Sequence, residues 1–349
     1  MKYFLSDSVH YNYQDSKLTI LDQTKLPGSE EYIVISEEKQ LYDAIYNLKV
    51  RGAPAIGIAA AFGLAAMLNK HIQSDLINYL KCFDEISSNL LKTRPTAVNL
   101  RNALERMRVV LNQCLSNGVS DPAIINDYLA KEAIKIKDED IAANLVMAEN
   151  VLSLLKPGSS VLTYCNAGHL AVSRYGTALS PIYLAHERGE AINVYVCETR
   201  PLMQGSRLTC YELKKRGIPF TLICDNMVSH LFSLNKIDAV ITGCDRIAKN
   251  GDTANKIGTS MVSVVAKYYG IPHYVVGPGS TIDTLSPNGE SIEIEYRDGD
   301  EITEMWFSER MTPEKINVMN PSFDITKADL ISAIITEKGI FRYPYNFTL

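Results

Sequence analysis

The chain has 349 residues, of which 46% are hydrophobic and 21% are charged, and its formal net charge is -5. This length allows one large domain or two ordinary ones, with a substantial buried core. A mildly acidic chain without a basic run argues against nucleic acid as its principal partner.

The N-terminal segment and the cysteines indicate the expected compartment. The segment MKYFLSDSVH has neither the apolar core nor the small-residue cleavage pattern of a signal peptide. The longest apolar run, Ala55 to Leu68, is too short to span a bilayer and predicts a buried helix. The seven cysteines lack CxxC spacing and indicate reduced thiols. We therefore expect a cytoplasmic protein that does not bind membranes.

The first 157 residues predict a small sheet followed by helices. Short apolar runs within residues 1–35, separated by Pro27-Gly28, predict a small antiparallel sheet. From Glu37 to about Pro157 the apolar residues recur at helical spacing. Start and stop signals predict helices around 41–48, at 55–68, 75–91 and 97–115, and from Ser120-Asp121-Pro122 to Lys156-Pro157-Gly158.

Beyond Gly158, apolar strands alternate with helical stretches. The expected strands are Ser160–Cys165, Ile192–Cys197, Phe220–Cys224, Ile237–Thr242 and His273–Val276. Near-continuous apolar strands with helical crossovers predict a parallel sheet covered on both faces. The predicted fold class is α/β, with a small N-terminal antiparallel sheet plus helical domain at residues 1–157 and a Rossmann-like parallel-sheet domain at residues 158–349.

The stretch from Ile237 to Tyr269 contains a dense group of polar residues. An apolar strand leads into a polar loop, and a helix follows from about Gly258. The loop carries Asp245, Arg246, Asn250, Asp252, Asn255 and Lys256. Because ligands bind at the carboxyl ends of strands in open parallel sheets, this loop is a candidate site. Asp245 or Asp252 could instead cap the helix, but a cap needs only one such residue.

Other strand ends carry reactive or charged side chains. Cys165, Glu198 and Asp225 follow three of the expected strands and should converge on the same edge of the sheet. We expect a helix after Cys165, whose N-terminal amides lower the pKa of the thiol and cradle an anion. Cysteines at four strand ends also suggest a metal site. No pair of them has the short spacing of a zinc site, and buried cysteine is common in cores, so we predict no metal.

A second polar cluster lies in the helical region. Arg51-Gly52-Ala53-Pro54 directly precedes the most apolar helix. Glycine permits close backbone approach, proline suits the first helical turn, and arginine is a bidentate phosphate donor. Arg94, before Pro95-Thr96, repeats the pattern, although either arginine could be a solvated surface residue. Neither loop has the spacing of a P-loop or a dinucleotide fingerprint. The residues alone therefore indicate a phosphorylated small molecule, a thiol and a carboxylic acid.

Six longer segments of the chain form recognisable motifs. They are RGAPAIGIAAAFGLA (51–65), RPTAVNL (94–100), CNAGHLAVSRYGTAL (165–179), ETRPLMQGSRLT (198–209), DRIAKNGDTANKIGT (245–259) and NPSFDITKADLISAIITEKGI (320–340). Together they resemble methylthioribose-1-phosphate isomerases of methionine salvage. The resemblance implies a cofactor-free homodimer that interconverts 5-methylthioribose 1-phosphate and 5-methylthioribulose 1-phosphate, with Cys165 and Asp245 as the catalytic pair. The implied substrate-binding positions are Arg51, Gly52, Ala53, Arg94, Gln204, Asn255 and Lys256.

The implied chemistry suits these residues. A sugar with a phosphorylated anomeric oxygen cannot open to a free aldehyde, so the enzyme must help to break the ring C–O bond. We expect Asp245, with a pKa raised by burial, to protonate the ring oxygen. Cys165 would assist the transfer of hydrogen between C2 and C1, through an enolate or by a hydride shift. Arg51, the Gly52–Ala53 backbone and Lys256 would hold the phosphate between the two domains.

Some positions depart from the family pattern. Cys244 stands where the family usually has alanine, His169 replaces a smaller residue, and Gly277–Gly279 is richer in glycine than is typical. The preference for the group at C5 is therefore open, and an isomerase for 5-deoxyribose 1-phosphate or ribose 1,5-bisphosphate is the nearer alternative. The resemblance also implies a fold shared with the regulatory subunits of initiation factor 2B, which are binding proteins. Retention of Cys165, Asp245, Arg51 and Lys256 together argues against that class.

Overall fold

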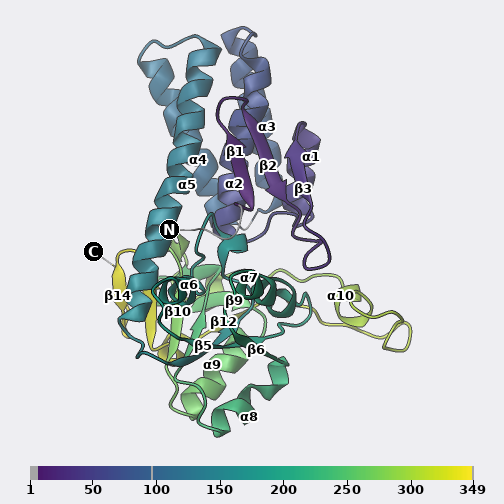
Figure 1. Cartoon of the computed structure of the whole chain (residues 1–349). Helices are drawn as coiled ribbons and strands as arrows, with labels where there is room; N and C mark the ends of the chain where they lie inside the picture. The colour runs from purple at the N-terminus through teal and green to yellow at the C-terminus, as the bar shows by residue number, and fades with distance from the viewer. Residues whose placement is uncertain (1–6, 96, 348–349) are drawn as a thin grey trace. The chain divides into compact units, whose positions relative to one another are not determined.

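The computed structural model describes residues 7–95 and 97–347, and these form two compact units (Figure 1). The helical unit holds the described residues up to Asn144 together with Gly168–Gly176. The sheet unit holds Leu145–Ala167 and the described chain from Thr177 onward. The predicted α/β class is confirmed. The domain boundary near Pro157 stays a prediction, and Thr96, next to the Arg94 segment, lies outside the described residues.

The helical unit combines a three-stranded antiparallel sheet with long helices. Its strands are β1 (Val9–Asn12), β2 (Lys17–Leu21) and β3 (Tyr32–Ile35). Its helices are α1 (Glu38–Tyr46), α2 (Ala53–Leu68), α3 (Leu76–Thr93), α4 (Val98–Ser116) and α5 (Pro122–Leu152), which continues into the sheet unit. Two predicted helix starts are capped: Asp75 accepts a bond from the Asn78 N–H and Asp121 from the Ala123 N–H, both at 2.8 Å.

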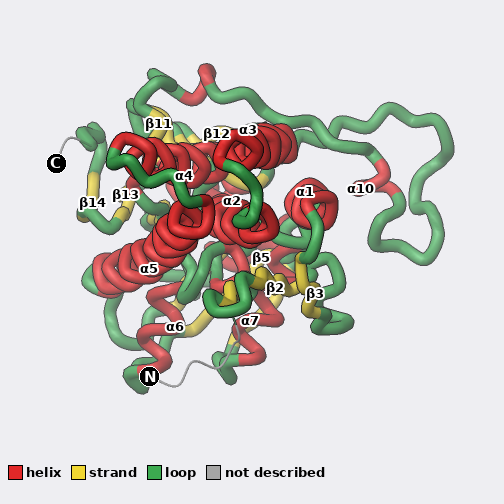
Figure 2. The backbone as a smooth tube through the Cα atoms, turned by 90° about the horizontal axis from the view of Figure 1, so that it is seen from above, coloured by secondary structure: helices red, strands yellow, loops and turns green. Residues whose placement is uncertain are grey.

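Helix α2 forms the core of this unit. Its residues from Ala55 to Leu68 are all buried, and it contacts β1, β2, α3 and α4 (Figure 2). Glycine permits the close approaches, since a Cβ on Gly57 would lie 2.8 Å from the Asn99 carbonyl oxygen. The segment Ala53–His71 is long and apolar enough to cross a membrane, but 78% of its apolar window is buried inside the protein, which is typical of a core helix.

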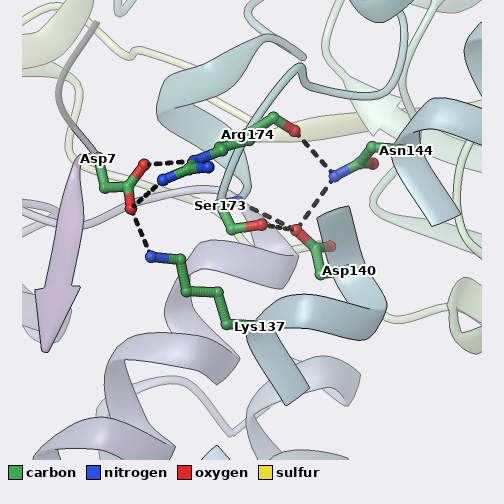
Figure 3. A network of polar contacts seen from close by, with 6 residues as sticks. All are labelled: Asp7, Lys137, Asp140, Asn144, Ser173 and Arg174. Atoms are coloured by element: carbon green, nitrogen blue, oxygen red, sulfur yellow. Dashed lines mark hydrogen bonds and ion pairs between the residues drawn. The ribbon is translucent and has the colours of Figure 1, made fainter. Parts of the chain in front are cut away.

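The segment Gly168–Gly176 follows β4 in the sequence but packs within the helical unit (Figure 3). Asp140 of α5 accepts bonds from the Ser173 backbone N–H at 3.0 Å and from the Ser173 hydroxyl. Asn144, one turn further along α5, donates to Asp140 and to the Arg174 carbonyl, both at 3.1 Å. These bonds fix the segment against α5.

Two carboxyl groups of this network have opposite pKa shifts. Desolvation by burial would raise the pKa of Asp7, but bonds and charges from Arg174 and Lys137 outweigh it and lower this pKa. The Arg174 Nε atom lies 2.9 Å from the Asp7 carboxylate. Asp140 receives its bonds from neutral donors, and burial raises its pKa to about 6. Asp7 therefore acts as an ion-pair partner, whereas Asp140 is a desolvated acceptor.

The sheet unit is built on a seven-stranded sheet in the order β14-β13-β10-β7-β4-β5-β6. The strands are β4 (Ser160–Tyr164), β5 (Asn193–Cys197), β6 (Phe220–Ile223), β7 (Ala239–Thr242), β10 (His273–Val276), β13 (Ala333–Thr336) and β14 (Gly339–Phe341). The five expected strands are confirmed, and β13 and β14 extend the sheet beyond the prediction. All neighbours are parallel except β14, which is antiparallel to β13.

The chain winds through this sheet in two directions. It runs outward from β4 through β5 to β6, returns to the other side of β4, and continues through β7 and β10 to β13. Helices α6 (Ser180–Glu187) and α7 (Cys210–Lys215) cover one face, and α8 (Val228–Ser233) and α9 (Thr259–Tyr268) cover the other (Figure 1). This is the doubly wound order, and its switch point lies between β4 and β7.

A second sheet corrects the prediction of a polar loop after β7. Strands β8 (Arg246–Ala248) and β9 (Thr253–Lys256) form an antiparallel hairpin, flanked by β11 (Ile282–Asp283) and β12 (Phe323–Thr326). All four residues of β9 are buried, three of them with polar side chains. The loop prediction is wrong because β9 pairs with β12, nearly 70 residues away by the numbering, and polarity in one segment does not reveal such pairing.

Candidate active site

The candidate catalytic residues follow neighbouring strands at the switch point of the sheet. Tyr164, the last residue of β4, is paired with Thr242, the last residue of β7. Cys165 comes directly after the first strand and Asp245 three residues after the second. Parallel strands place their carboxyl ends on one edge, so both residues begin loops at the edge where doubly wound sheets bind ligands.

Cys165 has a left-handed backbone, with φ at +65°. For a residue with a Cβ this conformation costs about 1–2 kcal/mol. Two threonine hydroxyls satisfy its backbone: the Cys165 N–H donates to Thr199 Oγ1 at 2.9 Å, and Thr209 Oγ1 donates to the Cys165 carbonyl at 2.7 Å. The half-buried thiol is therefore presented by a strained turn held from both sides.

Thr199 is itself held in a left-handed conformation, with φ at +66°. Asp225, which follows β6, accepts the N–H of Thr199 at 2.8 Å and that of Arg200 at 2.7 Å. Thr199 Oγ1 also donates to the Cys197 carbonyl at 3.1 Å. The loops after β4, β5 and β6 are thus linked in series, from Asp225 through Thr199 to Cys165.

The expected helix directly after Cys165 is absent from the described residues. After Cys165 come only the three-residue 3-10 turn His169–Ala171 and, from Ser180, helix α6. The prediction of a helix N-terminus beside the thiol is wrong, because the chain extends at Gly168 and enters the helical unit. There Gln23 Nε2 donates to the Leu170 carbonyl at 2.9 Å. The buried His169 lies in the same turn.

Gln204 lies in the loop between β5 and α7. Its side chain is buried, and its Oε1 atom has no hydrogen-bond partner among residues 7–95 and 97–347. The neighbouring Gly205 must be glycine, since a Cβ there would lie 1.7 Å from the Cys197 carbonyl oxygen. Trp306 supports this loop by donating its Nε1–H to the Pro201 carbonyl at 2.7 Å. A buried acceptor on a supported loop suits a role in substrate binding.

Asp245 begins the hairpin, and its side chain is exposed. Its N–H donates to the Ala254 carbonyl at 2.9 Å, which joins the backbone to β9. The expectation of a buried Asp245 is therefore wrong, because pairing of the hairpin fixes the backbone without covering the side chain. Any desolvation of this carboxyl group must come from what binds beside it.

Asn255 and Lys256 lie buried on β9. Asn255 Nδ2 donates to Thr259 Oγ1 at 2.9 Å, and Lys256 Nζ lies 4.6 Å from the centroid of the Phe323 ring. Asp324, opposite Asn255 on β12, accepts the N–H groups of Gly258 and Ser260 at the start of α9. Burial raises the pKa of Asp324 to about 6, although these bonds and the charge of Lys256 oppose the shift.

This arrangement overturns the helix-cap alternative for Asp252 and Asp245. Asp252 accepts bonds from the N–H groups of Gly289 at 3.0 Å and Ala328 at 2.8 Å, far along the chain from α9. Burial alone would raise the pKa of Asp252, but these backbone donors reverse the shift and lower it. The start of α9 is instead bonded to Asp324.

The other substrate-binding positions that the family resemblance implies lie in the helical unit. Gly52 is the N-cap of α2, with φ at +93°, and a Cβ there would lie 2.4 Å from the Ala171 carbonyl oxygen. Ala53 opens the helix, two residues before the expected start at Ala55, and Pro54 lies in its first turn as expected. Arg51 and Arg94 are half-buried, and Arg94 is the C-cap of α3.

Two positions that the resemblance marks as departures, Cys244 and Gly277, lie close together. Thr242 of β7 is paired with Val275 of β10, and Cys244 and Gly277 each follow these paired residues by two positions. A Cβ on Gly277 would lie 2.6 Å from Cys244 Sγ. A side chain at position 277 would therefore require the Cys244 thiol to move.

All seven cysteines are free thiols. Burial raises the pKa of Cys197 and Cys244, with added repulsion from Asp225 and Asp245 respectively, and burial raises the pKa of Cys210 to about 11. In the part of the chain that the structure describes, no group of three His, Cys, Asp or Glu residues could hold a metal ion.

We expect Asp324→Asn to change the pH dependence of stability. A carboxyl group whose pKa is higher in the folded chain than in the unfolded chain stabilises the fold fully below the unfolded pKa. That stabilisation is lost as pH rises through about 6. Asn keeps an oxygen acceptor without titrating, so the wild-type advantage in unfolding free energy should fall by about 1–2 kcal/mol between about pH 4 and pH 7.

Urea denaturation of both proteins at the two pH values measures this difference. Asp252→Asn is the matched control, because Asp252 also accepts two backbone N–H groups but has a lowered pKa. Its contribution is present above the unfolded pKa and lost as pH falls, so the trend should have the opposite sign. The same trend in both variants would contradict the assignment.

Comparison with known proteins agrees with this architecture. A profile of the initiation factor 2 subunit family matches residues 49–343. A methylthioribose-1-phosphate isomerase of Parabacteroides distasonis is 52% identical over 337 residues, which are 95% of this chain and 98% of that protein. A 5-deoxyribose 1-phosphate isomerase of Petrotoga mobilis is 50% identical over 341 residues, which are 98% of this chain and 97% of that protein.

Two crystal structures have the same fold along nearly the whole chain. The 5-methylthioribose 1-phosphate isomerase of Pyrococcus horikoshii is 37% identical with a TM-score of 0.90, and the match covers 98% of this chain and 94% of that one. The initiation factor eIF-2B subunit delta of A. fulgidus is 40% identical with a TM-score of 0.87, covering 98% and 97%.

The chain therefore belongs to the initiation factor 2 subunit family. Within it, the resemblance to methylthioribose-1-phosphate isomerases is confirmed, and the relatives support an isomerase that acts on a sugar phosphate.

Proposed function

We propose that this protein interconverts 5-methylthioribose 1-phosphate and 5-methylthioribulose 1-phosphate. The observation that carries the proposal is the pair Cys165 and Asp245, which follow adjacent strands at the switch point of the doubly wound sheet. The identity of about half the residues with an isomerase of that name supports the same substrate. A purely regulatory subunit would have no use for a strained thiol-bearing turn and an exposed acid that follow adjacent strands.

Asp245 supplies the proton that opens the ring. Its proton passes to the ring oxygen, the bond between C1 and that oxygen breaks, and the oxygen becomes the C4 hydroxyl. The exposed carboxyl group is covered by the substrate itself, and the neighbouring phosphate dianion favours its protonated form. In this scheme the bound substrate, rather than burial within the protein, keeps Asp245 protonated until it donates its proton.

Cys165 acts on the hydrogen that moves between C2 and C1. In the enolate route the thiolate removes the C2 proton, the same hydrogen or one from solvent is returned to C1, and the C2 hydroxyl gives its proton to the Asp245 carboxylate that ring opening left. In the hydride route the C2 hydrogen migrates to C1 with its electron pair, and the C2 hydroxyl gives its proton to the same carboxylate to form the ketone. The strained turn fixes the sulfur against C2 in either case.

A second candidate substrate is favoured by one relative. The 50% identical protein from Petrotoga mobilis is named a 5-deoxyribose 1-phosphate isomerase. The two substrates differ only in the methylthio group at C5, and apolar pockets discriminate such differences by about 1–3 kcal/mol.

The test is to measure kcat/KM of the purified protein for three sugar phosphates. We expect 5-methylthioribose 1-phosphate to be favoured over 5-deoxyribose 1-phosphate by about 10–200-fold, as a filled apolar pocket would give. Ribose 1,5-bisphosphate should be poorer still, because its second phosphate would have to be desolvated. A higher value for either competitor would contradict the proposed substrate, and no turnover of all three would contradict an isomerase.

We expect Asp245→Asn to reduce turnover by about 10²–10⁴, since the amide has the size of the acid but no transferable proton. Binding of the ketose product should survive. Asp238→Asn is the matched control, because Asp238 precedes the same strand at its opposite end and accepts the Ser160 N–H at 2.8 Å. Near-normal turnover of folded Asp245→Asn would remove this residue from the mechanism.

We expect Arg51→Ala to raise KM strongly, because a charge-assisted phosphate contact is lost. It should also lower kcat if phosphate binding energy is used at the reacting carbon. Arg51→Lys should restore activity only in part, since an ammonium cannot reproduce the planar two-donor fork.

Steady-state kinetics on both Arg51 variants, with thermal melts to verify folding, measure this role. Arg108→Ala is the control, since Arg108 is a partly exposed arginine of the same unit that pairs with Asp84. Unchanged kcat and KM in Arg51→Ala would mean that other residues hold the phosphate.

A further inference from the structure

A buried carboxyl group, that of Glu212, is hydrogen-bonded to Asn166, the residue that follows Cys165. Glu212 of α7 is fully buried. Its Oε1 atom accepts a hydrogen bond from Asn166 Nδ2 at 2.8 Å, and its Oε2 atom accepts one from the Tyr183 hydroxyl at 2.6 Å. Burying a carboxylate costs several kcal/mol unless it is fully bonded, so a residue of this kind is seldom incidental.

The hydrogen bonds around Asn166 have a defined direction. Thr209 gives its hydroxyl proton to the Cys165 carbonyl, so it can only accept from Asn166 Nδ2, which lies 3.2 Å away. Glu212 is the second acceptor for the same amide nitrogen. Two acceptors on one side require the NH₂ group there, which fixes the orientation of the Asn166 amide.

The segment that carries these acceptors has an unusual backbone. Residues Gly205–Thr209 form a π-helical turn that runs directly into α7. Thr209 and Glu212 are three residues apart, so both project from the same face of this helix. Single π-helical turns are rare and often occur at functional sites.

The other side of Glu212 is held by an aromatic and cationic stack. Tyr183 of α6 is fully buried, and the Arg216 guanidinium lies 3.9 Å from the centroid of its ring. Arg216 is also buried and pairs with Glu187 at 3.6 Å. The stack fixes the tyrosine, whose hydroxyl in turn fixes the carboxyl group that orients Asn166.

We propose that Glu212 is a positioning residue for Cys165: it orients Asn166 and, through Thr209, holds the Cys165 carbonyl and the left-handed turn. The inference rests on the proposed role of Cys165 in isomerisation. What the turn requires from Glu212 is its two acceptor positions, one for Asn166 and one for Tyr183. A glutamine can meet the same need, since its oxygen can accept from Asn166 while its NH₂ group donates to the Tyr183 oxygen.

The test combines kinetics with labelling of Cys165 by iodoacetamide, followed by mass spectrometry. Glu212→Ala should lower kcat by about 10², the loss expected from a displacement of the reacting group by about 1 Å, with KM little changed. It should also label Cys165 several-fold faster, because the relaxed turn exposes the thiol more often. Glu212→Gln should stay close to wild type in both measurements.

Glu301→Gln is the matched control for the removal of a buried carboxyl group. Glu301 is also buried and accepts from an asparagine amide, that of Asn320 at 3.1 Å, and its other partner is Arg297. It should lose stability without a change in the labelling rate of Cys165. Thr209→Val removes only the hydroxyl that donates to the Cys165 carbonyl. Its kcat and Cys165 labelling rate should resemble those of Glu212→Ala. The test therefore stays decisive if Glu212→Ala fails to fold.

Wild-type labelling and kcat in either Glu212→Ala or Thr209→Val would overturn the proposal. So would a loss in Glu212→Gln as large as that in Glu212→Ala. The labelling experiment needs no substrate, so it separates this inference from the proposed function. If the wild-type protein turned over no sugar phosphate, or if Cys165→Ala kept full activity, the proposed function would fail while the labelling pattern would still decide the role of Glu212.

Discussion

The left-handed backbone of Cys165 is the constraint on which the candidate site depends. A turn of this kind relaxes unless its neighbours hold it, and here both of its polar backbone atoms are bonded to threonine hydroxyls. One hydroxyl belongs to the loop after β5, which Asp225 holds from the loop after β6. The other belongs to the π-helical turn that enters α7. Two connections, β5 to β6 and β6 to β7, therefore hold the turn that presents one sulfur atom.

The apolar strands of the large sheet could be predicted from the sequence, whereas the pairing of the polar strands after Asp245 could not. Apolar runs ending in Cys165, Cys197 and Thr242 identify buried strands by composition alone, and the rule for parallel sheets then places the residues that follow at one edge. The hairpin after Asp245 escapes this reasoning, because β9 is stabilised by pairing with β12 rather than by its own pattern. A polar strand whose pairing partner lies far along the chain is therefore mistaken for a loop.

The site residues show the same division between local and long-range information. Gly52 and Pro54 could be assigned to a helix start because capping is local, and the structure places them there. The helix expected after Cys165 fails because Gln23, 147 residues before Leu170, and Asp140, 33 residues before Ser173, hold the following segment in the helical unit. The pair of Cys244 and Gly277 is likewise invisible in one sequence, since it depends on the register of β7 against β10.

The acidic side chains of the sheet unit bear on the proposal that Asp245 is the acid. Asp225, Asp252 and Asp324 each accept two backbone N–H groups, so their oxygens fix loops and helix starts. These three carboxyl groups are committed to the fold, which argues against any of them as the proton donor. Asp245 has an exposed side chain, and its backbone N–H, bonded to Ala254, fixes its position at the start of the hairpin. A fixed backbone with an exposed carboxyl group is what the proposed proton transfer to a ligand requires.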